Sequence, residues 1–334
     1  AEWDELSGTS SKTKFRDALA ETMGALKELS DALKSAQADE LGLYNDLSLG
    51  VDGAVATFRE FILGLDLVWA ASDPGYVYWT EWAIRSSGLA RMIAAPLSIA
   101  DKLNEMLYKQ KSSVVLCSAT LRVGGSFNYI DKRLGINLIE PGRVLACVAA
   151  SPFDYLRQCA ALAPAFLPDP AASLAKNGEY VEQLAALMLD VFIKTRGRAL
   201  GLFTSYQMMN QVAHLLEDPL REAGIRLLVH GVDGTRDQIT RIFRSGDPSV
   251  LLGTHSFWEG VDVAGEALSC VVMARLPFSA VGDPVVEARC EQIDQNGGSS
   301  FREFSLPLAV IRFRQGFGRL IRTKTDRGLV TVLD

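Results

Sequence analysis

The chain has 334 residues, of which 48% are hydrophobic, so it is long enough for two or more domains with sizeable cores. Its formal net charge is −6, which excludes a bulk positive field that would draw the chain to nucleic acid, and any DNA contact must be local. No apolar run approaches the length of a membrane span and no signal peptide opens the sequence, so we expect a cytoplasmic protein with no membrane partner.

The first 88 residues have the pattern of two amphipathic helices. Apolar residues recur at intervals of three and four in two stripes, which are Phe15, Leu19, Met23, Leu26, Leu29 and Leu33, and then Val55, Phe58, Phe61, Ile62 and Leu65. Gly50, Asp52 and Gly53 indicate the turn between the two helices. We expect a helical hairpin, whose role is either purely structural or active.

Aromatic residues follow the second stripe: Trp69, Tyr76, Tyr78, Trp79 and Trp82. Their rings could stack on nucleic acid bases. The alternation of Tyr76 and Tyr78 is typical of a half-buried strand, however, and favours places in a core or a sheet.

A helix and a strand are predicted next. Pro96 and Leu97 lead into a helix that ends near Lys111, and the apolar run from Val114 to Cys117 predicts a strand. Ser118 and Thr120 would lie at the tip of this strand.

From about residue 150 onwards, apolar strands alternate with amphipathic helices. The predicted strands are 199–204, 225–229, 250–253, 269–274 and 329–333, and the predicted helices are 180–194, 206–217 and 235–244. This alternation predicts an α/β fold with right-handed crossovers and a doubly wound parallel sheet. Ligands of such sheets bind outside the carboxyl ends of the strands, where Thr204, Ser205 and Thr254 would lie.

The most informative segment is Arg314-Gln315-Gly316-Phe317-Gly318-Arg319-Leu320-Ile321-Arg322. On a helix, Gln315, Arg319 and Arg322 fall at i, i+4 and i+7 and form one polar stripe, whereas Phe313, Phe317 and Leu320 face the core. Guanidinium groups give forked hydrogen bonds to phosphate oxygens, so the stripe indicates a polyphosphate reader. The alternative is a solvated helix face. The two glycines indicate that a backbone or a ligand comes close.

Four segments occur in a fixed order. They are Val114-Val115-Leu116-Cys117-Ser118-Ala119-Thr120-Leu121, Leu200-Gly201-Leu202-Phe203-Thr204-Ser205-Tyr206, Leu251-Leu252-Gly253-Thr254-His255-Ser256-Phe257-Trp258-Glu259-Gly260-Val261-Asp262, and the arginine segment. Together they resemble motifs III, IV, V and VI of superfamily 2 helicases, specifically the DinG and XPD family. The resemblance covers roughly residue 90 to the end.

The resemblance implies a domain scheme. Residues 1–88 would be part of a helical arch beside the path of single-stranded DNA, and 89–124 would return to the first helicase domain with motif III. Residues 125–150 would be a linker, and 151–334 would form the second, RecA-like helicase domain with motifs IV, V and VI.

The resemblance also implies roles for individual residues. Arg319 and Arg322 would face the ATP phosphates, and Gln315 would orient these arginines or the attacking water. Glu259, Gly260 and Asp262 would lie in the same cleft.

Asp262 would bind the ribose or an arginine, or else would only cap a turn. Ser118 and Thr120 would couple the nucleotide state to movement on DNA, or else would only satisfy a strand end. Thr204, Ser205 and Thr254 would hold DNA phosphates without reading sequence. His255 is expected to be structural.

Parts of such a motor are absent from this sequence. It has no Gly-Lys dipeptide, hence no phosphate-binding loop, and no D-E-x-H box follows an apolar strand. The resemblance implies that ATP and Mg²⁺ are held mainly by a first domain encoded before residue 1. An iron–sulfur cluster is open for the full protein, but we expect no metal site in this chain, because its five cysteines form no C-x-x-C pair.

The sequence thus predicts a portion of an ATP-dependent DNA helicase that acts 5′ to 3′ on single-stranded DNA or DNA forks, and this portion alone is expected to be inactive. The main alternative is a non-catalytic nucleic-acid-binding or regulatory subunit with a motor-like fold. A nucleotide-binding α/β enzyme of another class is the second alternative. No protein partner is indicated.

Overall fold

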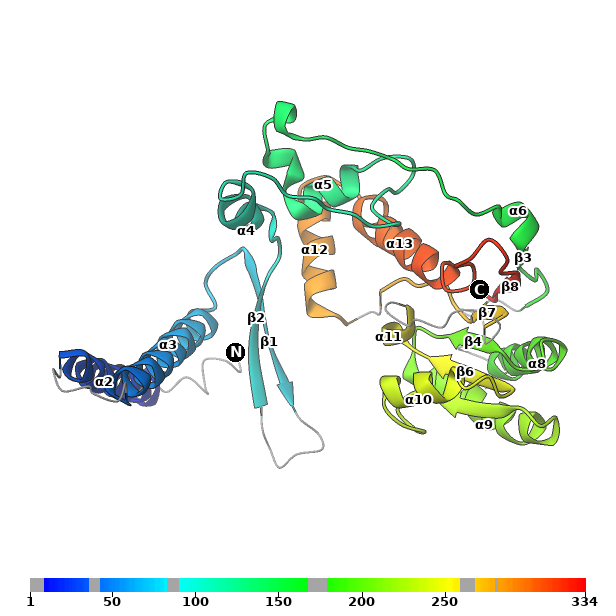
Figure 1. Cartoon of the computed structure of the whole chain (residues 1–334), viewed down its shortest axis with the longest axis horizontal. Coiled ribbons are helices and arrows are strands. Elements are labelled where there is room, and N and C mark those ends of the chain that lie inside the picture. The colour runs from blue at the N-terminus through cyan, green and yellow to red at the C-terminus, as the bar shows by residue number, and fades with distance from the viewer. Residues whose placement is uncertain (1–8, 36–42, 83–89, 168–178, 259–267, 280–281) are drawn as a thin grey trace. The chain divides into compact units, whose positions relative to one another are not determined.

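The computed structural model describes residues 9–35, 43–82, 90–167, 179–258, 268–279 and 282–334. The chain divides into two compact units, Ala1–Leu97 and Ser98–Asp334 (Figure 1), which are described separately. In the first unit, strand β1 (Tyr76–Trp82) pairs with strand β2 (Ala90–Pro96), so the expected boundary at residue 88 falls between two paired strands. The assignment of regions to helicase domains stays a prediction.

Two long helices, α2 (Thr9–Ser35) and α3 (Leu43–Ala70), make up most of the first unit. Val55, Ile62 and Leu65 of the second predicted stripe are buried, as the helical spacing requires if this face packs on the other helix. The prediction of two paired helices is therefore confirmed, but three residues of the predicted apolar stripes are 48–51% exposed, namely Phe15, Leu29 and Phe61.

Charged residues join the two helices at both ends of their contact. Arg16 holds Asp66 through two hydrogen bonds of 2.7 and 3.0 Å, and Lys34 lies 2.7 Å from Asp52. The Asp52 carboxylate also accepts a 2.6 Å hydrogen bond from the Ser30 hydroxyl. Because early residues of α2 meet late residues of α3, the helices run in opposite directions.

The predicted turn at Gly50, Asp52 and Gly53 is wrong, because all three residues lie inside α3. The connection between the helices falls in 36–42, outside the described residues. A glycine inside a helix costs about 1 kcal/mol relative to alanine. Packing against α2 and the bonds made by Asp52 offset this cost, so the helix continues through the turn signals.

The aromatic residues that the structure describes have neighbours within the first unit. The rings of Tyr76 and Tyr78 stack at 6.3 Å on the antiparallel β1–β2 hairpin, which confirms the predicted strand. The Trp69 ring meets the edge of Phe15 at 6.4 Å and lies under the Lys12 ammonium group. These contacts favour the structural alternative over base stacking, and the side chain of Trp82 lies outside the described residues.

The second unit begins with short helices. They are α4 (Ala100–Leu103), which continues into the π-helical turn η1 (Asn104–Tyr108), then α5 (Asn128–Leu134) and the 3₁₀ turns η2 (Ile136–Leu138) and η3 (Pro141–Arg143). The helix predicted after Pro96 is thus present from Ala100. Gly135 ends α5 with φ +70°, and a Cβ there would lie 2.4 Å from the Ala100 carbonyl oxygen, so α5 packs closely on α4.

The strand predicted at Val114–Cys117 does not form. The segment pairs with no strand among the residues that the structure describes, and Val115 is 86% exposed. A parallel strand needs neighbours on its edges to bind its N–H and carbonyl groups. The resemblance places those neighbours in a first domain that this chain does not contain.

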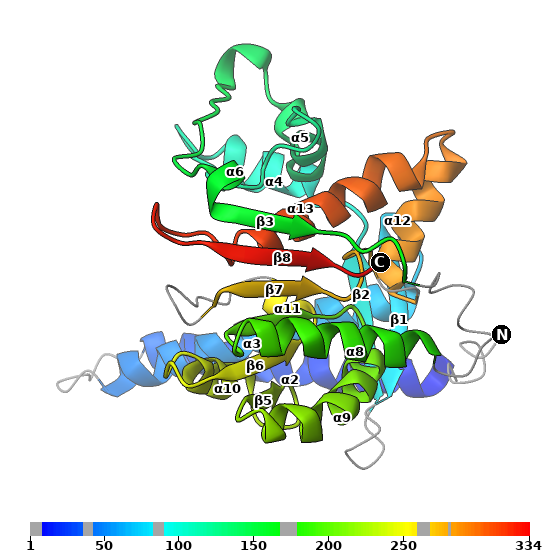
Figure 2. The ribbon, with the colours of Figure 1, turned by 90° about the vertical axis from the view of Figure 1, so that its right-hand side faces the viewer.

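A six-stranded parallel sheet forms the centre of the second unit (Figure 2). Its spatial order is β3 (Cys159–Leu162), β8 (Gly328–Val332), β7 (Cys270–Met273), β4 (Ala199–Leu202), β6 (Ser249–Gly253) and β5 (Arg226–Val229). Five of these strands were predicted within two residues of their bounds. β3 was missed because Cys159-Ala160-Ala161-Leu162 lacks β-branched residues and lies at the sheet edge.

Helices cover both faces of the sheet, so the sheet is doubly wound as predicted. Helices α8 (Glu179–Lys194) and α9 (Tyr206–Glu222) enclose one buried cluster with alternate strand residues such as Val250 and Leu252. Helices α10 (Arg236–Phe243), α11 (His255–Trp258) and α13 (Leu306–Phe317) contribute to the other cluster, which includes Leu251. This alternation follows from the two-residue period of strands.

The remaining helices are α6 (Tyr155–Gln158), α12 (Pro284–Gln295) and the π-helical turn η5 (Phe301–Ser305). Among the described residues, no helix combines the length and the apolar character that crossing a bilayer requires.

Candidate nucleotide and nucleic-acid site

The arginine segment is helical only in its first part. α13 ends at Phe317, and Arg319 and Leu320 continue as a tighter turn whose N–H groups bind the carbonyls of Gly316 and Phe317. The predicted single helical stripe is therefore wrong beyond Gly318, because Arg319 and Arg322 follow the helix end. The apolar side was predicted correctly: Leu320 is buried, and Phe313 and Phe317 pack against the same cluster.

Arg319 is joined to two other motif segments. Its Nη2 atom donates a 3.0 Å hydrogen bond to the carbonyl oxygen of Trp258, and the indole Nε1 of Trp258 donates a 3.1 Å bond to the carbonyl of Phe203. Trp258 is only 1% exposed, and its bond to Phe203 is buried, whereas the bond from Arg319 is partly buried. The segments resembling motifs IV, V and VI thus meet around this tryptophan.

The surroundings of Gly316 explain why one of the two glycines of the segment is needed. A Cβ at this position would lie 3.0 Å from Trp258 Cε3 and 3.1 Å from Leu202 Cδ1. The close approach expected from the sequence is therefore made, and the neighbours are core side chains.

Gln315 lies one residue before Gly316 and has a buried carboxamide oxygen. This Oε1 atom has no hydrogen-bond partner among the described residues. An unsatisfied buried acceptor costs about 1–3 kcal/mol, which a donor from a ligand or from another part of the protein would remove.

Arg322 lies in a loop that Asp326 closes. The Asp326 carboxylate accepts hydrogen bonds of 2.8 Å from the N–H groups of Arg322 and Thr323, and one of 2.6 Å from the Thr323 hydroxyl. Burial raises the pKa of Asp326, but these hydrogen bonds outweigh burial, so its pKa lies below the ordinary value. Burial, followed by the charge of Arg244, lowers the pKa of the Arg322 guanidinium.

Sequence reasoning missed Gln158, which is 7% exposed at the end of α6. Its Nε2 atom donates 2.9 Å hydrogen bonds to the carbonyls of Thr323 and Asp326. No local sequence pattern indicates these partners, because they lie 165 and 168 positions further along the chain.

Glu259, Gly260 and Asp262 were predicted to line the nucleotide cleft. All three lie outside the described residues. Their roles stay predictions.

The three hydroxyl residues predicted at the DNA path do not share one environment. Ser205 is exposed and caps α9, where its hydroxyl accepts a 3.4 Å hydrogen bond from the Met208 N–H, and Thr204 is half-buried. Thr254 is only 2% exposed, and its hydroxyl lies 3.4 Å from His230 Nδ1. The structure therefore offers Ser205 and Thr204 to a surface ligand, and Thr254 contacts His230 instead.

His230 was also missed, although it directly follows β5. Its Nδ1 atom lies 3.3 Å from the Tyr206 hydroxyl, and its ring meets the edge of Phe257 at 5.0 Å. Burial, followed by the charge of Arg236, lowers the pKa of His230. His230 thus connects the residues that follow β4, β5 and β6.

Ser118 and Thr120, the predicted coupling residues, are hydrogen-bonded to each other. Their hydroxyl oxygens lie 3.2 Å apart, and the Thr120 N–H donates to Ser118 Oγ at 3.2 Å. Two residues further on, the Arg122 carbonyl accepts a hydrogen bond from Arg314 of α13. The segment that resembles motif III is thus joined to the helix that begins motif VI.

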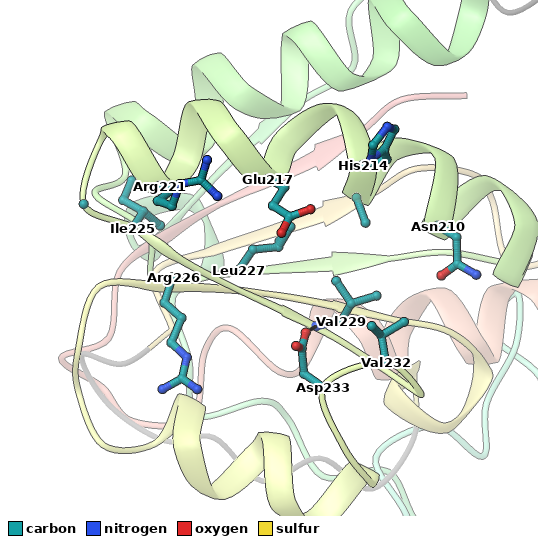
Figure 3. A pocket seen from close by; sticks show the side chains of 12 residues that line it. Asn210, His214, Glu217, Arg221, Ile225, Arg226, Leu227, Val229, Val232 and Asp233 are labelled. Carbon is teal, nitrogen blue, oxygen red and sulfur yellow. Dashed lines mark hydrogen bonds between the residues drawn. The ribbon is translucent and has the colours of Figure 1, made fainter.

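A cavity of about 600 Å³ lies beside the edge strand β5 (Figure 3). Figure 3 shows Glu217 of α9 and Asp233 of the loop after β5 on opposite walls. Its other lining residues include Asn210, His214, Arg221, Arg226 and Leu227. None of the predicted site residues that the structure describes lines this cavity, so the motifs do not account for it.

Comparisons with known proteins agree with these motifs. Residues 188–334 match the family described as helicase C-terminal domain. The ATP-dependent DNA helicase YoaA of Haemophilus influenzae is 37% identical over 260 residues, which are 78% of this chain and 38% of that protein. The protein named 3′-5′ exonuclease DinG of Bacillus subtilis is 34% identical over 280 residues, 83% of this chain and 29% of that protein.

A solved structure named XPD helicase superposes on this chain with a TM-score of 0.58 at 17% sequence identity. The superposition covers 92% of this chain and 52% of the XPD chain. This likeness concerns the fold. The chain spans well under half the length of the two curated relatives. The chain is therefore a homologue of the YoaA and DinG proteins, with an XPD-like helicase fold and a helicase C-terminal domain at residues 188–334.

Proposed function

We propose that this chain is the carboxyl-terminal motor portion of an ATP-dependent DNA helicase, which uses ATP hydrolysis to move along single-stranded DNA. The observation that carries the proposal is the series of contacts from Arg319 through Trp258 to Phe203 on a RecA-like sheet. The homologous YoaA protein, which is named as an ATP-dependent DNA helicase, supports it.

The groups around α13 suit a polyphosphate and an attacking water. Arg319 and Arg322 both come after the end of α13 and are three positions apart in the sequence. Guanidinium groups stabilise the charge that develops on a transferred phosphoryl group. The buried Oε1 atom of Gln315 is an acceptor, which suits an O–H group of the attacking water. Glu259, Gly260 and Asp262 would complete this side of the cleft.

ATP and Mg²⁺ would be held mainly by a first domain outside this chain, because the sequence contains no Gly-Lys dipeptide for a phosphate-binding loop. When bound, Mg²⁺ neutralises charge on the β and γ phosphates. Any iron–sulfur cluster of the full protein would also be held outside this chain.

The same first domain would cover the unpaired segment at Val114–Cys117. Val114 and Leu116 line a pocket of about 450 Å³ together with Phe127 and Ile130. Apolar surface of this kind is stabilised when a neighbouring strand or helix removes it from water. Ser118 and Thr120, at the end of this segment, would then couple the nucleotide site to movement.

Single-stranded DNA would cross the carboxyl ends of β4 and β6. Ser205 and Thr204 would contact phosphates there through hydroxyl and backbone N–H groups, which bind without sequence preference. Closure and opening of two RecA-like domains around ATP would then pass the strand along in steps, in the 5′-to-3′ direction that the resemblance implies. The first unit would act as an arch beside that strand.

The test is strand displacement by the full-length protein on forks that carry either a 5′ or a 3′ single-stranded tail, with one strand labelled. We expect ATP-dependent displacement on the 5′-tailed fork. Binding without displacement or ATP hydrolysis would favour a non-catalytic subunit. ATP-independent shortening of the labelled strand would instead indicate a nuclease.

A further inference from the structure

The residues that lead into the sheet contact both ends of the segment that carries Arg319 and Arg322. On one side, the Tyr155 ring meets the edge of Phe317, the last residue of α13, with ring centroids 5.5 Å apart. Tyr155 is itself supported by Phe153, whose ring lies 6.0 Å away. The helix end before the arginines is therefore held from outside the helix.

On the other side, Gln158 holds the loop that follows the arginines. Its Nε2 atom donates to the carbonyl oxygens of Thr323 and Asp326, both at 2.9 Å, and its Oε1 atom accepts from the Asp154 N–H at 2.9 Å. Gln158 is 7% exposed. Both ends of one carboxamide are thus satisfied in a buried place, where hydrogen bonds fix positions most strongly.

The loop between these two carbonyls is held internally by Asp326. Its carboxylate takes the N–H groups of Arg322 and Thr323 at 2.8 Å each. Gln158 binds the carbonyls of Thr323 and Asp326, and Asp326 binds the N–H groups of Arg322 and Thr323, so both side chains hold the backbone of this loop. The side chain of Arg322 therefore extends from a backbone whose position is fixed.

Fixing the backbone matters because a guanidinium lowers the barrier to phosphoryl transfer only when it is held in the right place. Burial, followed by the charge of Arg244, lowers the pKa of the Arg322 guanidinium, and the charge of Asp326 raises it. The hydrogen bonds of Gln158 and Asp326 hold the backbone of the loop from which the Arg322 side chain extends.

We propose that Gln158 is a positioning residue for ATP hydrolysis, which acts through the 322–326 loop on Arg322. The proposal rests on the proposed function, in which Arg322 acts on the ATP phosphates. Because the Asp154 N–H belongs to the same set of bonds, Gln158 also joins the chain that arrives from the first part of the unit to the arginine loop. Movement of that lead-in chain would therefore reach the loop that follows Arg322.

The experiment is a double-mutant cycle in the full-length protein, with DNA-stimulated ATP hydrolysis as the readout. Gln158→Leu keeps the approximate volume of the side chain and removes its hydrogen bonds. We expect it to lower kcat on the order of 10- to 100-fold with little change in KM for ATP, because the change misplaces a group that acts in the transition state. In the Arg322→Ala background, Gln158→Leu should lower kcat no further.

Gln158→Glu is the second variant and keeps the shape most closely. At neutral pH its carboxylate has no donor for the two carbonyl oxygens and is repelled by them. Its protonated form can donate to one of these oxygens, so kcat of this variant should partly recover as pH falls. Gln292→Leu, on the exposed surface of α12, is the matched control and should leave kcat unchanged. Thermal melting of each variant separates unfolding from misplacement.

Each outcome decides between the claims. If Gln158→Leu lowers kcat by the same factor in the wild type and in the Arg322→Ala background, the glutamine only supports the fold and the inference is overturned. Full activity of Gln158→Leu together with an impaired Arg322→Ala variant would also overturn the inference. Full activity of Arg322→Ala would instead refute the proposed function. If Gln158→Leu does not fold, an unimpaired Gln158→Glu variant would overturn the proposal.

Discussion

Arg319 and Trp258 are joined by a 3.0 Å hydrogen bond from the guanidinium Nη2 to the backbone carbonyl, and this bond connects the turn after α13 to the end of α11. Trp258 in turn donates to the carbonyl of Phe203, directly after β4. Two hydrogen bonds therefore connect the end of β4, where we propose that DNA binds, to an arginine that we propose acts on ATP.

Packing around Trp258 gives the first prediction. Gly316→Ala would place a Cβ 3.0 Å from the indole ring, so we expect a loss of about 1–3 kcal/mol in the free energy of unfolding. Gly50→Ala has open space around it inside α3 and should stabilise by about 1 kcal/mol. Urea unfolding of both variants measures these changes. If Gly50→Ala destabilised the protein, the result would contradict the helical position of Gly50 and would favour the turn that the sequence predicted.

A pH dependence follows from His230. Burial, followed by the charge of Arg236, lowers the pKa of His230 in the folded state, so the unfolded chain binds the proton more tightly. The stabilising contribution is present above the unfolded pKa of about 6.5 and is lost as pH falls through the lower folded pKa.

His230→Gln should therefore flatten the fall in unfolding free energy between about pH 7.5 and about pH 5.5, measured by urea denaturation. The control is His214→Gln, on the exposed surface of α9. In this variant the unfolding free energy should change with pH as it does in the wild type. Equal slopes in the wild type and the His230 variant would remove His230 as the cause.

Ser205 allows the helix cap to be separated from DNA contact. Ser205→Asp keeps a capping oxygen for α9 but adds a negative charge at the proposed phosphate path. We expect unchanged stability together with weaker binding of single-stranded DNA, and a smaller dependence of affinity on salt.

Fluorescence anisotropy across a salt titration measures this effect, with Thr254→Ala for comparison. Because Thr254 is buried, its variant should retain DNA affinity and lose stability instead. If Ser205→Asp bound DNA like the wild type, the carboxyl ends of these strands would not be the DNA path.

The sequence predicted the central sheet well for a physical reason. Parallel strands buried on both faces are continuous apolar runs, such as Val250 to Leu252, and the helices between them show a clear helical period. Motifs IV and V follow the strands β4 and β6 of this sheet, and the roles of their residues stay predictions.

Elements that depend on distant partners were predicted less well. The end of α13 is followed by a loop that Asp326 and Gln158 hold, and no local pattern around Arg322 shows this. Val114–Cys117 has the pattern of a strand, but it pairs with no strand among the described residues. Gly50 and Gly53 are turn signals that the long contact between α2 and α3 overrides.

The chain by itself should not hydrolyse ATP. Its sequence has no phosphate-binding loop, and the proposed magnesium ligands belong to another domain. A steady-state ATPase assay of residues 1–334 with single-stranded DNA should give the background rate. DNA-stimulated hydrolysis by this chain alone would show that it contains a complete nucleotide site.

The most direct test of the account measures ATP hydrolysis and DNA affinity side by side in the full-length protein carrying Arg319→Ala or Arg322→Ala. An arginine that stabilises the phosphoryl transition state is worth on the order of 10³-fold or more in rate, so hydrolysis should fall about that far while DNA affinity stays within a few fold. Arg302→Ala, on the exposed surface of η5, is the control and should change neither. Retained hydrolysis with lost DNA binding would contradict the account, because it would place both arginines on the DNA path.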